Sequence, residues 1–405
     1  MEEFAAHARD SGLLDGGDEE RFDENYAYEF DANYEVFDEK FDAKVAHDLM
    51  EDGYSVIDNF LGFEWAMALR QELQWLHQKG LMKPNKTHFL GEGGKVLEFS
   101  KPHISELDLH DNSARSRVPA LKSLFEEAPR LAAVAGARLP ALGLRAGPRH
   151  QTLKLQRNGG RGGCFPLHYD NPGAPNKRML TCLLYLNPEW KEGDGGEVRL
   201  WPFLRRPRDV APLLDRLLLF RSDRVLHRVL PARAERYCLT IWLDGTAANA
   251  PGDATLRLDL GRLATAAGAA AVAGELRRGP AQRLVSRGVY AEEYAASLAE
   301  CMAGGDPRGR AALEALHRAH LARQSPALVA LVEALRAVRG TLEAEEGQGR
   351  GPREEEEEGK YHQNGGVRQE QVTDPSPLSM ESKKTVVKKE EEPGKADEGT
   401  RGGGV

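Results

Sequence analysis

The sequence has few cysteines, no long apolar run and no basic nucleic-acid-binding segment, and each absence excludes a class of protein. Its four cysteines form no CxxC pair, so the pattern indicates neither a disulfide framework nor a zinc knuckle. No stretch approaches the roughly 20 apolar residues that span a bilayer. The first 20 residues are acidic and lack the apolar core of a secretory signal. We therefore expect no membrane partner and a reduced, intracellular compartment, cytoplasmic and/or nuclear.

The net charge of −8 is distributed unevenly along the chain. Residues 1–42 carry 15 acidic and three basic side chains, and residues 351–405 carry 13 and nine, which leaves +8 for residues 43–350. A basic body between acidic ends favours an acidic partner. Because no basic helix or aromatic–basic platform occurs, we do not expect nucleic acid to be that partner.

Composition divides the chain into four parts. Residues 1–42 mix acids and aromatics with few aliphatics, which predicts a disordered tail; a docking segment that folds on a partner is the alternative. Residues 43–245 are expected to form the catalytic domain. Residues 246–345 are rich in Ala and Leu and predict a helical appendage without a chemistry-bearing motif, and residues 346–405 predict a low-complexity disordered tail.

Helical periodicity gives way to strand periodicity at Gln151. Residues 63–79 and 120–135 have helical spacing, and Pro129 is expected to kink or split the second helix. From residue 151 to 244, seven short apolar runs are separated by turn signals such as NPGAPN and EGDGG. This pattern predicts an all-β sandwich or barrel, with the two helices against one sheet. Later, residues 311–321 and 326–342 are expected to form amphipathic helices.

His168 and Asp170 are the strongest candidates for a metal site. Residues two apart in a strand point to the same face, so both side chains would aim at one point. His227 lies in a later predicted strand, RVLHRVL, and Arg236 opens another, RYCLTIWL. Each has a plain alternative: a core histidine bonded to a backbone carbonyl, and a strand-end arginine in solvent.

These four residues suit iron(II) better than zinc. Two imidazoles and one carboxylate leave three coordination positions open, two for a bidentate 2-oxo acid and one for O₂. A buried arginine then offers a planar fork for the distal carboxylate of that acid. Zinc would more often use three or four closed nitrogen or sulfur ligands, and no cysteine is suitably placed.

Several motifs in fixed order over about residues 150–244 resemble the catalytic domain of 2-oxoglutarate- and iron(II)-dependent prolyl hydroxylases. They are HYDNPG, RMLTCLLYLNPEW, GGEVRLWP, DRLLLFRSDRVLHRVLPA and ERYCLTIWLDG. The oxygen-sensing hydroxylases that act on hypoxia-inducible factor are the most similar branch, and GYSVIDNFLG at 53–62 resembles the start of the same domain. The resemblance implies a mainly β fold with flanking helices, namely a double-stranded β-helix, or jelly roll.

The resemblance also implies roles for individual residues. Iron(II) binding and catalysis would fall to His168, Asp170 and His227. The 2-oxoglutarate site would comprise Arg236, which pairs with the distal carboxylate, Tyr185, which hydrogen-bonds it, and Thr240 and Trp242, which line the pocket. Arg178 would lie at the substrate groove. Core packing is the alternative for Trp242, and a turn-adjacent base is the alternative for Arg178.

One position departs from the family pattern. The family usually has a tyrosine near the iron about ten residues before the first histidine ligand. The corresponding stretch here, LQRNGGRGGCFPLHYD, has Arg157 or Asn158 instead. Whether this change alters oxygen sensitivity or only the water structure beside the metal is left open.

The sequence therefore predicts a dioxygenase that uses Fe(II), 2-oxoglutarate and O₂, with L-ascorbate as reductant. It would hydroxylate C4 of prolyl residues in an acidic protein substrate, with oxygen sensing as one role to test. Two alternatives remain: a catalytically silent jelly-roll binding module, and an oxygenase acting on another protein residue or on a free amino acid. The sequence does not indicate an oligomeric state.

Overall fold

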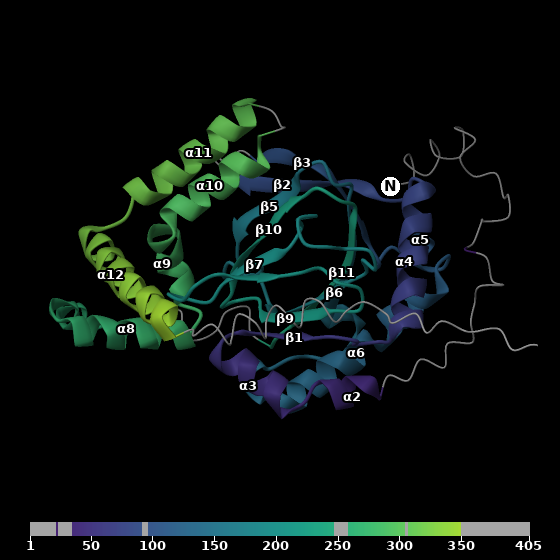
Figure 1. Cartoon of the computed structure of the whole chain (residues 1–405), viewed down its shortest axis with the longest axis horizontal. Helices are drawn as coiled ribbons and strands as arrows, with labels where there is room; N and C mark the ends of the chain where they lie inside the picture. The colour runs from purple at the N-terminus through teal and green to yellow at the C-terminus, as the bar shows by residue number, and fades with distance from the viewer. Residues whose placement is uncertain (1–21, 23–34, 91–95, 247–257, 304–306, 350–405) are drawn as a thin grey trace, which may run out of the picture. The chain divides into compact units, whose positions relative to one another are not determined.

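Two antiparallel sheets form the centre of this computed structural model, which describes residues 22, 35–90, 96–246, 258–303 and 307–349 (Figure 1). The larger sheet has, in spatial order, β1 (Tyr54–Ile57), β9 (Leu217–Arg221), β6 (Arg178–Tyr185), β11 (Arg236–Asp244), β4 (Gln151–Asn158), β3 (Val96–Asp108) and β2 (Lys83–Leu90). The smaller has β5 (Gly163–His168), β10 (Leu226–Ala232), β7 (Val198–Trp201) and β8 (Arg208–Val210). The predicted jelly roll is confirmed, with eight strands rather than seven between residues 151 and 244 because Arg208–Val210 forms a short additional strand.

Alternation along the strands gives the larger sheet two buried faces. In β11, Leu239, Ile241 and Leu243 belong to the core shared with the N-terminal helices, whereas Cys238 belongs to a second core between the sheets. Because successive strand residues point to opposite faces, Arg236, Thr240 and Trp242 lie on the same face as Cys238. The polar residues of β11 therefore point between the sheets.

The helices before β4 cover the outer face of the larger sheet. They are α2 (Val36–Lys40), α3 (Ala43–Glu51), α4 (Phe63–Gln78), α5 (Asn112–Arg115) and α6 (Pro119–Arg138), followed by the 3₁₀ turns η3 (Pro140–Leu142) and η4 (Pro148–His150). Pro129 lies inside a helix that continues without a break, so of the expected kink or split of α6 the split is wrong.

The predicted disordered tail is too long at its C-terminal end. Phe37 and Phe41 have 0% and 1% exposed surface, and both belong to the core beneath the larger sheet. Phe37 lies in α2 and Phe41 directly follows it, so residues 35–42 are part of the folded protein. Residues 1–21 and 23–34 lie outside the described residues.

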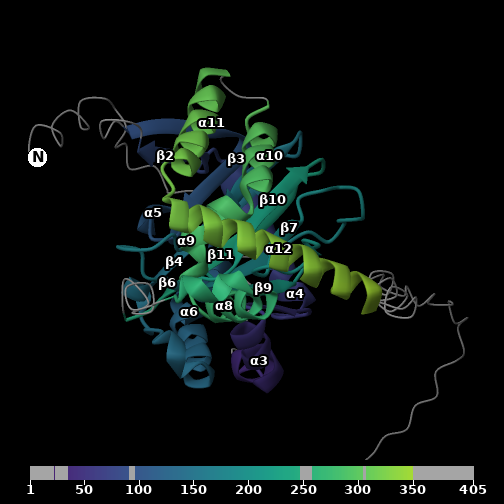
Figure 2. The same cartoon turned by 90° about the vertical axis from the view of Figure 1, so that its left-hand side faces the viewer.

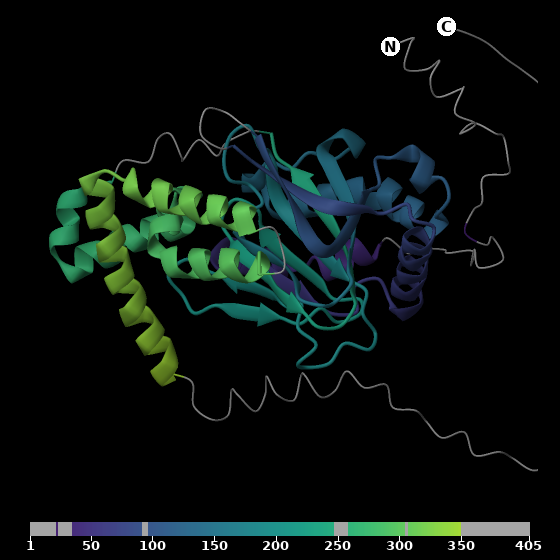
Figure 3. The same ribbon diagram turned by 90° about the horizontal axis from the view of Figure 1, so that it is seen from above.

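Five α-helices, against two predicted, follow the β-strands within the described residues 258–303 and 307–349. They are α8 (Ala266–Arg278), α9 (Gln282–Val289), α10 (Ala291–Cys301), α11 (Pro307–Ala322) and α12 (Pro326–Gly349), preceded by the 3₁₀ turn η5 (Leu260–Ala264). They lie beside the smaller sheet (Figures 2 and 3). A shared apolar cluster joins Leu167 and Leu226 of that sheet to Val272 and Leu335 of the helices. None of the described helices is long and apolar enough to span a membrane.

A disulfide bond links the smaller sheet to these helices. Cys164 of β5 and Cys301 at the end of α10 are joined with a Cα–Cα distance of 5.5 Å across 137 residues of sequence. Cysteine spacing gave no indication of this bond, because it arises from the packing of α10 on β5. Cys182 and Cys238 are buried free thiols.

Glu72 anchors α6 to α4 through a buried carboxylate. Its two oxygens accept hydrogen bonds from the backbone N–H groups of Ala120 and Leu121, each at 2.7 Å. Helix N-termini present such unpaired N–H groups, so the carboxylate satisfies two of them. Burial nevertheless raises the pKa of Glu72 from 4.5 to about 7, because it outweighs those two hydrogen bonds.

We predict that Glu72 makes stability depend on pH. Its raised pKa means that the folded chain keeps a proton that the unfolded chain releases between about pH 4.5 and 7. Its contribution to stability is complete below that range and is lost as pH rises through 7, a change on the order of 3 kcal/mol. Urea unfolding between about pH 4.5 and 8 should show this loss in the native chain and not in Glu72→Gln. An equal pH dependence in both proteins would contradict the prediction.

Candidate active site

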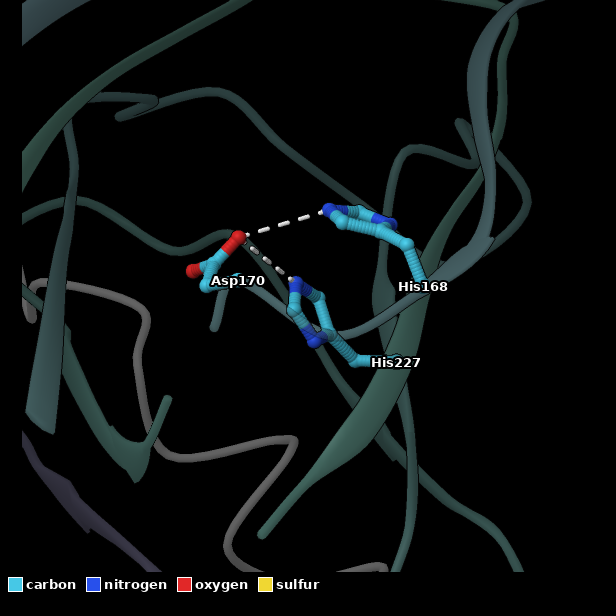
Figure 4. Close-up of side chains that lie close together, drawn as sticks. All are labelled: His168, Asp170 and His227. Atoms are coloured by element: carbon cyan, nitrogen blue, oxygen red, sulfur yellow. Dashed lines mark ion pairs between the residues drawn. The ribbon is translucent and has the colours of Figure 1, made fainter. Parts of the chain in front are cut away.

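Three predicted ligands meet between the sheets. His168 ends β5, Asp170 lies two residues beyond that strand, and His227 is the second residue of β10, where it pairs with His168. Figure 4 shows one carboxylate oxygen of Asp170 directed at both imidazoles. The Oδ1–Nε2 distances are 3.4 Å to His168 and 3.7 Å to His227. One potential ligand atom from each residue lies within 4.8 Å of the others.

Backbone carbonyls fix the tautomer of both histidines. Nδ1 of His168 lies 2.8 Å from the carbonyl oxygen of Pro166, and Nδ1 of His227 lies 3.2 Å from that of Val225. A carbonyl oxygen only accepts, so each Nδ1 carries the proton and each Nε2 keeps its lone pair for the site. Burial lowers the pKa of His227 to about 4, which keeps this ring neutral near pH 7.

The second oxygen of Asp170 is held by two donors. Oδ2 accepts hydrogen bonds from Thr181 Oγ1 at 2.8 Å and from Trp242 Nε1 at 2.9 Å. Burial alone would raise the pKa of Asp170, but the two imidazoles and the hydrogen bonds outweigh it and hold the pKa well below its usual value. The carboxylate is thus ionised and oriented, with Oδ1 left for a metal. The sequence placed Asp170 inside a strand, which is wrong, but its direction toward His168 was correctly expected.

Arg236 and Tyr185 form a second polar group in the same core. The guanidinium is 2% exposed, and its carbon lies 5.1 Å from the centroid of the Tyr185 ring. Nη1 of Arg236 donates to Cys238 Sγ at 3.2 Å. Among the described residues, no hydrogen-bond partner meets Nε or Nη2 of Arg236 or the hydroxyl of Tyr185, which is fully buried. Burial raises the pKa of Tyr185, so its phenol stays protonated and available as a donor.

A glycine makes room for this arginine. A Cβ atom at Gly196, whose φ is +79°, would lie 2.8 Å from Cδ of Arg236. Gly196 belongs to the turn signal EGDGG that precedes β7, so the same residue ends the turn and admits the arginine stem.

The other predicted site residues lie around these two groups. Thr240 is buried on the same face of β11 as Arg236. Trp242, besides donating to Asp170, lies under the guanidinium of Arg178 at 4.1 Å from ring centroid to carbon. The alternative that Trp242 only packs in the core does not explain its hydrogen bond to Asp170.

Within the described residues, neither residue at the family's tyrosine position has a side-chain hydrogen bond to Arg236, although Asn158 pairs with Arg236 in the β4–β11 register. Arg157 forms an ion pair with Glu235, and Asn158 donates to the carbonyl oxygen of Gly163 at 2.8 Å. Gln156 lies on the same face of β4 as Asn158, and its Oε1 is 3.7 Å from Cys238 Sγ. Sequence reasoning missed Gln156, Cys238 and Thr181, which register alone brings to the site: Gln156 and Tyr185 both pair with Cys238, and Thr181 pairs with Trp242.

The residues present fit iron(II) and 2-oxoglutarate. Two neutral imidazole nitrogens and one carboxylate oxygen match the facial donor set of non-haem iron(II) oxygenases. The unpaired N–H groups of Arg236 and the hydroxyl of Tyr185 are donors that a buried carboxylate would satisfy. A buried guanidinium with two nitrogens left without hydrogen-bond acceptors is costly, and an anionic occupant is the physical explanation for it.

Comparisons with known proteins agree with this donor set. Residues 153–244 match the model of the 2OG-Fe(II) oxygenase superfamily. A hypoxia-inducible factor prolyl hydroxylase of Caenorhabditis elegans is 30% identical over 49% of this chain, which spans only 27% of that relative. The prolyl hydroxylase EGLN3 of Mus musculus is 29% identical over 48% of this chain and 79% of its own length.

A solved structure extends the likeness beyond the catalytic motifs. A prolyl 4-hydroxylase from Phytophthora capsici is 46% identical, with a TM-score of 0.66, and the alignment covers 78% of this chain and 98% of that one. At that identity and coverage the likeness includes sequence as well as fold. The chain therefore belongs to the 2-oxoglutarate- and iron(II)-dependent dioxygenases, in the family of the prolyl hydroxylases.

Proposed function

We propose that this chain hydroxylates C4 of prolyl residues in a protein substrate, with Fe(II), 2-oxoglutarate and O₂. The observation that carries the proposal is the buried guanidinium of Arg236, which has two unpaired N–H donors in the same core as the His168–Asp170–His227 cluster. A metal site alone would suit many proteins. The adjacent carboxylate receptor is what points to a 2-oxo dicarboxylic acid.

The proposal gives each group a separate task. His168, Asp170 and His227 hold the iron, which when bound supplies the oxidative chemistry with O₂ and the 2-oxo acid. Arg236 and Tyr185 hold the distal carboxylate, and Thr240 lines that pocket. Trp242 and Thr181 orient Asp170 through Oδ2. L-ascorbate would act as the reductant that restores iron(II) after turnover without substrate.

The direct test measures two products. The full chain with Fe(II), 2-oxoglutarate and ascorbate should release succinate and convert proline to 4-hydroxyproline in a protein substrate, located by ¹⁸O₂ labelling and mass spectrometry. His168→Ala should do neither. Absence of succinate release in the native chain would favour the silent binding module, whereas succinate without hydroxyproline would favour another target residue or a free amino acid. Dependence of the rate on O₂ tension tests the proposed role in oxygen sensing.

Two cations near the cluster support an acidic substrate. Lys101 of β3 places Nζ 4.0 Å from the centroid of Phe165 in β5, and Arg178 lies over Trp242. Within the described residues, no carboxylate lies at ion-pair distance from either side chain. Burial lowers the pKa of Lys101 to about 8, so it remains largely protonated near pH 7. Cations without an ion-pair partner near the ligands would attract carboxylates flanking the target proline.

We predict that these cations select acidic peptides. Lys101→Met and Arg178→Met should each raise KM for an acidic proline-containing peptide roughly tenfold, because each loses a charge pair with the substrate. The same peptide with Asn and Gln in place of its acids should be insensitive to both changes. Lys122→Met, on the exposed side of α6, is the matched control and should change neither KM. Equal effects on acidic and neutral peptides would contradict the assignment.

We also propose that the chain acts in the cytoplasm and/or nucleus. The support is the small number of cysteines, four in 405 residues with no CxxC pair, which is typical of proteins in reducing compartments. A disulfide such as that between Cys164 and Cys301 is unusual in a reducing compartment. The redox state of these two cysteines in the cell therefore tests the proposed location. Cell fractionation combined with thiol labelling before lysis should find the protein in these compartments and report the state of that bond.

A further inference from the structure

Helices α9 and α10 lie along the outside of the segment that carries His168 and Asp170. In Figure 1 both helices lie beside β5 and β10, and α10 packs directly on β5. His168 and Asp170 point to the ligand cluster, and the residues that alternate with them, Leu167, Tyr169 and Asn171, each receive one side-chain contact from these helices. We call residues 167–171 the ligand segment.

Ser297 of α10 holds the residue before His168. Its hydroxyl donates to the carbonyl oxygen of Tyr294 at 2.9 Å, so its oxygen is free to accept the backbone N–H of Leu167 at 3.1 Å. Leu167 is 4% exposed and Ser297 is fully buried. Without the serine, that N–H would lie unsatisfied in an apolar environment.

Ser286 of α9 holds the residue before Asp170 in the same way. Its hydroxyl donates to the carbonyl oxygen of Gln282 at 2.7 Å. The hydroxyl of Tyr169 lies 2.7 Å from Ser286 Oγ, and because the serine proton is already used, Tyr169 must be the donor. The direction of this hydrogen bond is therefore fixed, and it ties the side chain between the two ligands to α9.

Three further contacts join α9 and α10 to the ligand segment and to strands β5 and β10. Arg283 of α9 donates to the carbonyl oxygen of Asn171 at 3.0 Å, just after Asp170. Arg228, the neighbour of His227, forms an ion pair with Glu300 of α10. The disulfide between Cys164 and Cys301 adds a covalent link between β5 and the end of α10. Both histidine-bearing strands are thus attached to α10.

We propose that Ser286 and Ser297 are positioning residues for the iron ligands, and that the C-terminal helices set the geometry of the ligand segment from outside. The apolar cluster between these helices and the smaller sheet already packs the two together. The two serines add buried polar contacts at the neighbours of His168 and Asp170. Groups that orient metal ligands typically change metal affinity 10–100-fold when removed. This proposal depends on the ligand assignment and not on the identity of the substrate.

Cobalt(II) binding tests the proposal without turnover. Cobalt(II) is titrated anaerobically into the metal-free full chain and followed by its visible absorption. Ser286→Ala and Tyr169→Phe should each weaken cobalt(II) binding about tenfold. Because both changes remove the same hydrogen bond, the double variant should be no weaker than either single variant. Ser297→Ala should weaken binding independently of that pair.

The matched control is Tyr290→Phe. Tyr290 is fully buried in the same helical region, but its hydroxyl accepts from the backbone N–H of Leu204, in the connection between β7 and β8. Its loss removes one buried hydrogen bond that involves no residue of the ligand segment and should leave cobalt(II) affinity unchanged. Unchanged affinity in Ser286→Ala and Tyr169→Phe, or an equal loss in Tyr290→Phe, would overturn the proposal. If Ser286→Ala fails to fold, the result for Tyr169→Phe tests the proposal, because this change removes only the tyrosine hydroxyl of the same hydrogen bond.

Discussion

Asp170→Asn is expected to lose more than about 100-fold in metal affinity and to abolish succinate release, a larger effect than removal of an orienting group. The reason lies in the two donors at Oδ2. Thr181 and Trp242 both present hydrogen atoms there, so the amide oxygen of asparagine must take that position. The amide NH₂, which has no lone pair for a metal, is then forced into the position of Oδ1 between the two imidazoles.

Isothermal titration with manganese(II) and a succinate assay check this prediction. Asp209→Asn is the matched control, because Asp209 is a carboxylate of β8 in the smaller sheet and its partner is Arg199, not the ligand cluster. Asp170→Gly should behave like Asp170→Asn. Metal affinity near that of the native chain in both variants would show that Asp170 is not a ligand.

Arg236→Met is expected to lower kcat/KM for 2-oxoglutarate roughly 100-fold or more. Removal of one partner of a buried, hydrogen-bonded charge pair costs about 2–5 kcal/mol, and the distal carboxylate would lose its only cationic partner in our assignment. Arg236→Lys should also be impaired, because an ammonium cannot replace the planar fork beside Tyr185.

A shorter cosubstrate distinguishes the loss of binding to the distal carboxylate from a general loss of folding or activity. A 2-oxo acid without a distal carboxylate, such as 2-oxobutanoate, should be a poor cosubstrate for the native chain and nearly as poor for Arg236→Met. The native preference for 2-oxoglutarate should therefore disappear in the variant. Arg199→Gln, an exposed arginine paired with Asp209, is the control and should keep the preference. Retention of the preference in Arg236→Met would remove Arg236 from the cosubstrate site.

The sequence alone was enough to identify the candidate iron ligands and the candidate cosubstrate arginine, because these residues belong to recognisable motifs. The HYD motif, His227 and Arg236 could be recognised because each occurs in or beside an apolar strand pattern, and the structure brings ligand atoms of the three predicted ligands within 4.8 Å of one another. Alternation also explains why Arg236 and Trp242 of β11 lie on one side of the sheet, once the strand and its bounds are known. Turn spacing predicted an all-β sandwich or barrel with seven of the eight strands between residues 151 and 244, and the family resemblance implied the jelly roll.

What the sequence could not provide is register and long-range packing. Gln156 meets Cys238 only because β4 pairs with β11 in one of several possible registers. The hairpin β2–β3 was missed because KPNKTHFL is polar and contains a proline, and pairing with β4 outweighs that local preference. The α8–α10 helices were predicted only as part of an Ala- and Leu-rich helical region, because that composition indicates helix without marking where each helix begins and ends. The partner of Cys164 lies 137 residues away, beyond any spacing rule.

The contacts of Ser286 and Ser297 with the ligand segment determine which fragments of this enzyme can keep an intact metal site. A recombinant fragment ending after β11 would contain every metal and cosubstrate side chain assigned above, yet would leave the N–H of Leu167 and the hydroxyl of Tyr169 without their acceptors. We therefore expect that the catalytic domain of this chain, separated from the C-terminal helices, does not keep the native geometry of its metal ligands. In truncation studies, chimeras and inhibitor screens that use residues 43–245 alone, we expect weaker metal binding than in the full chain, because the ligands are less well oriented.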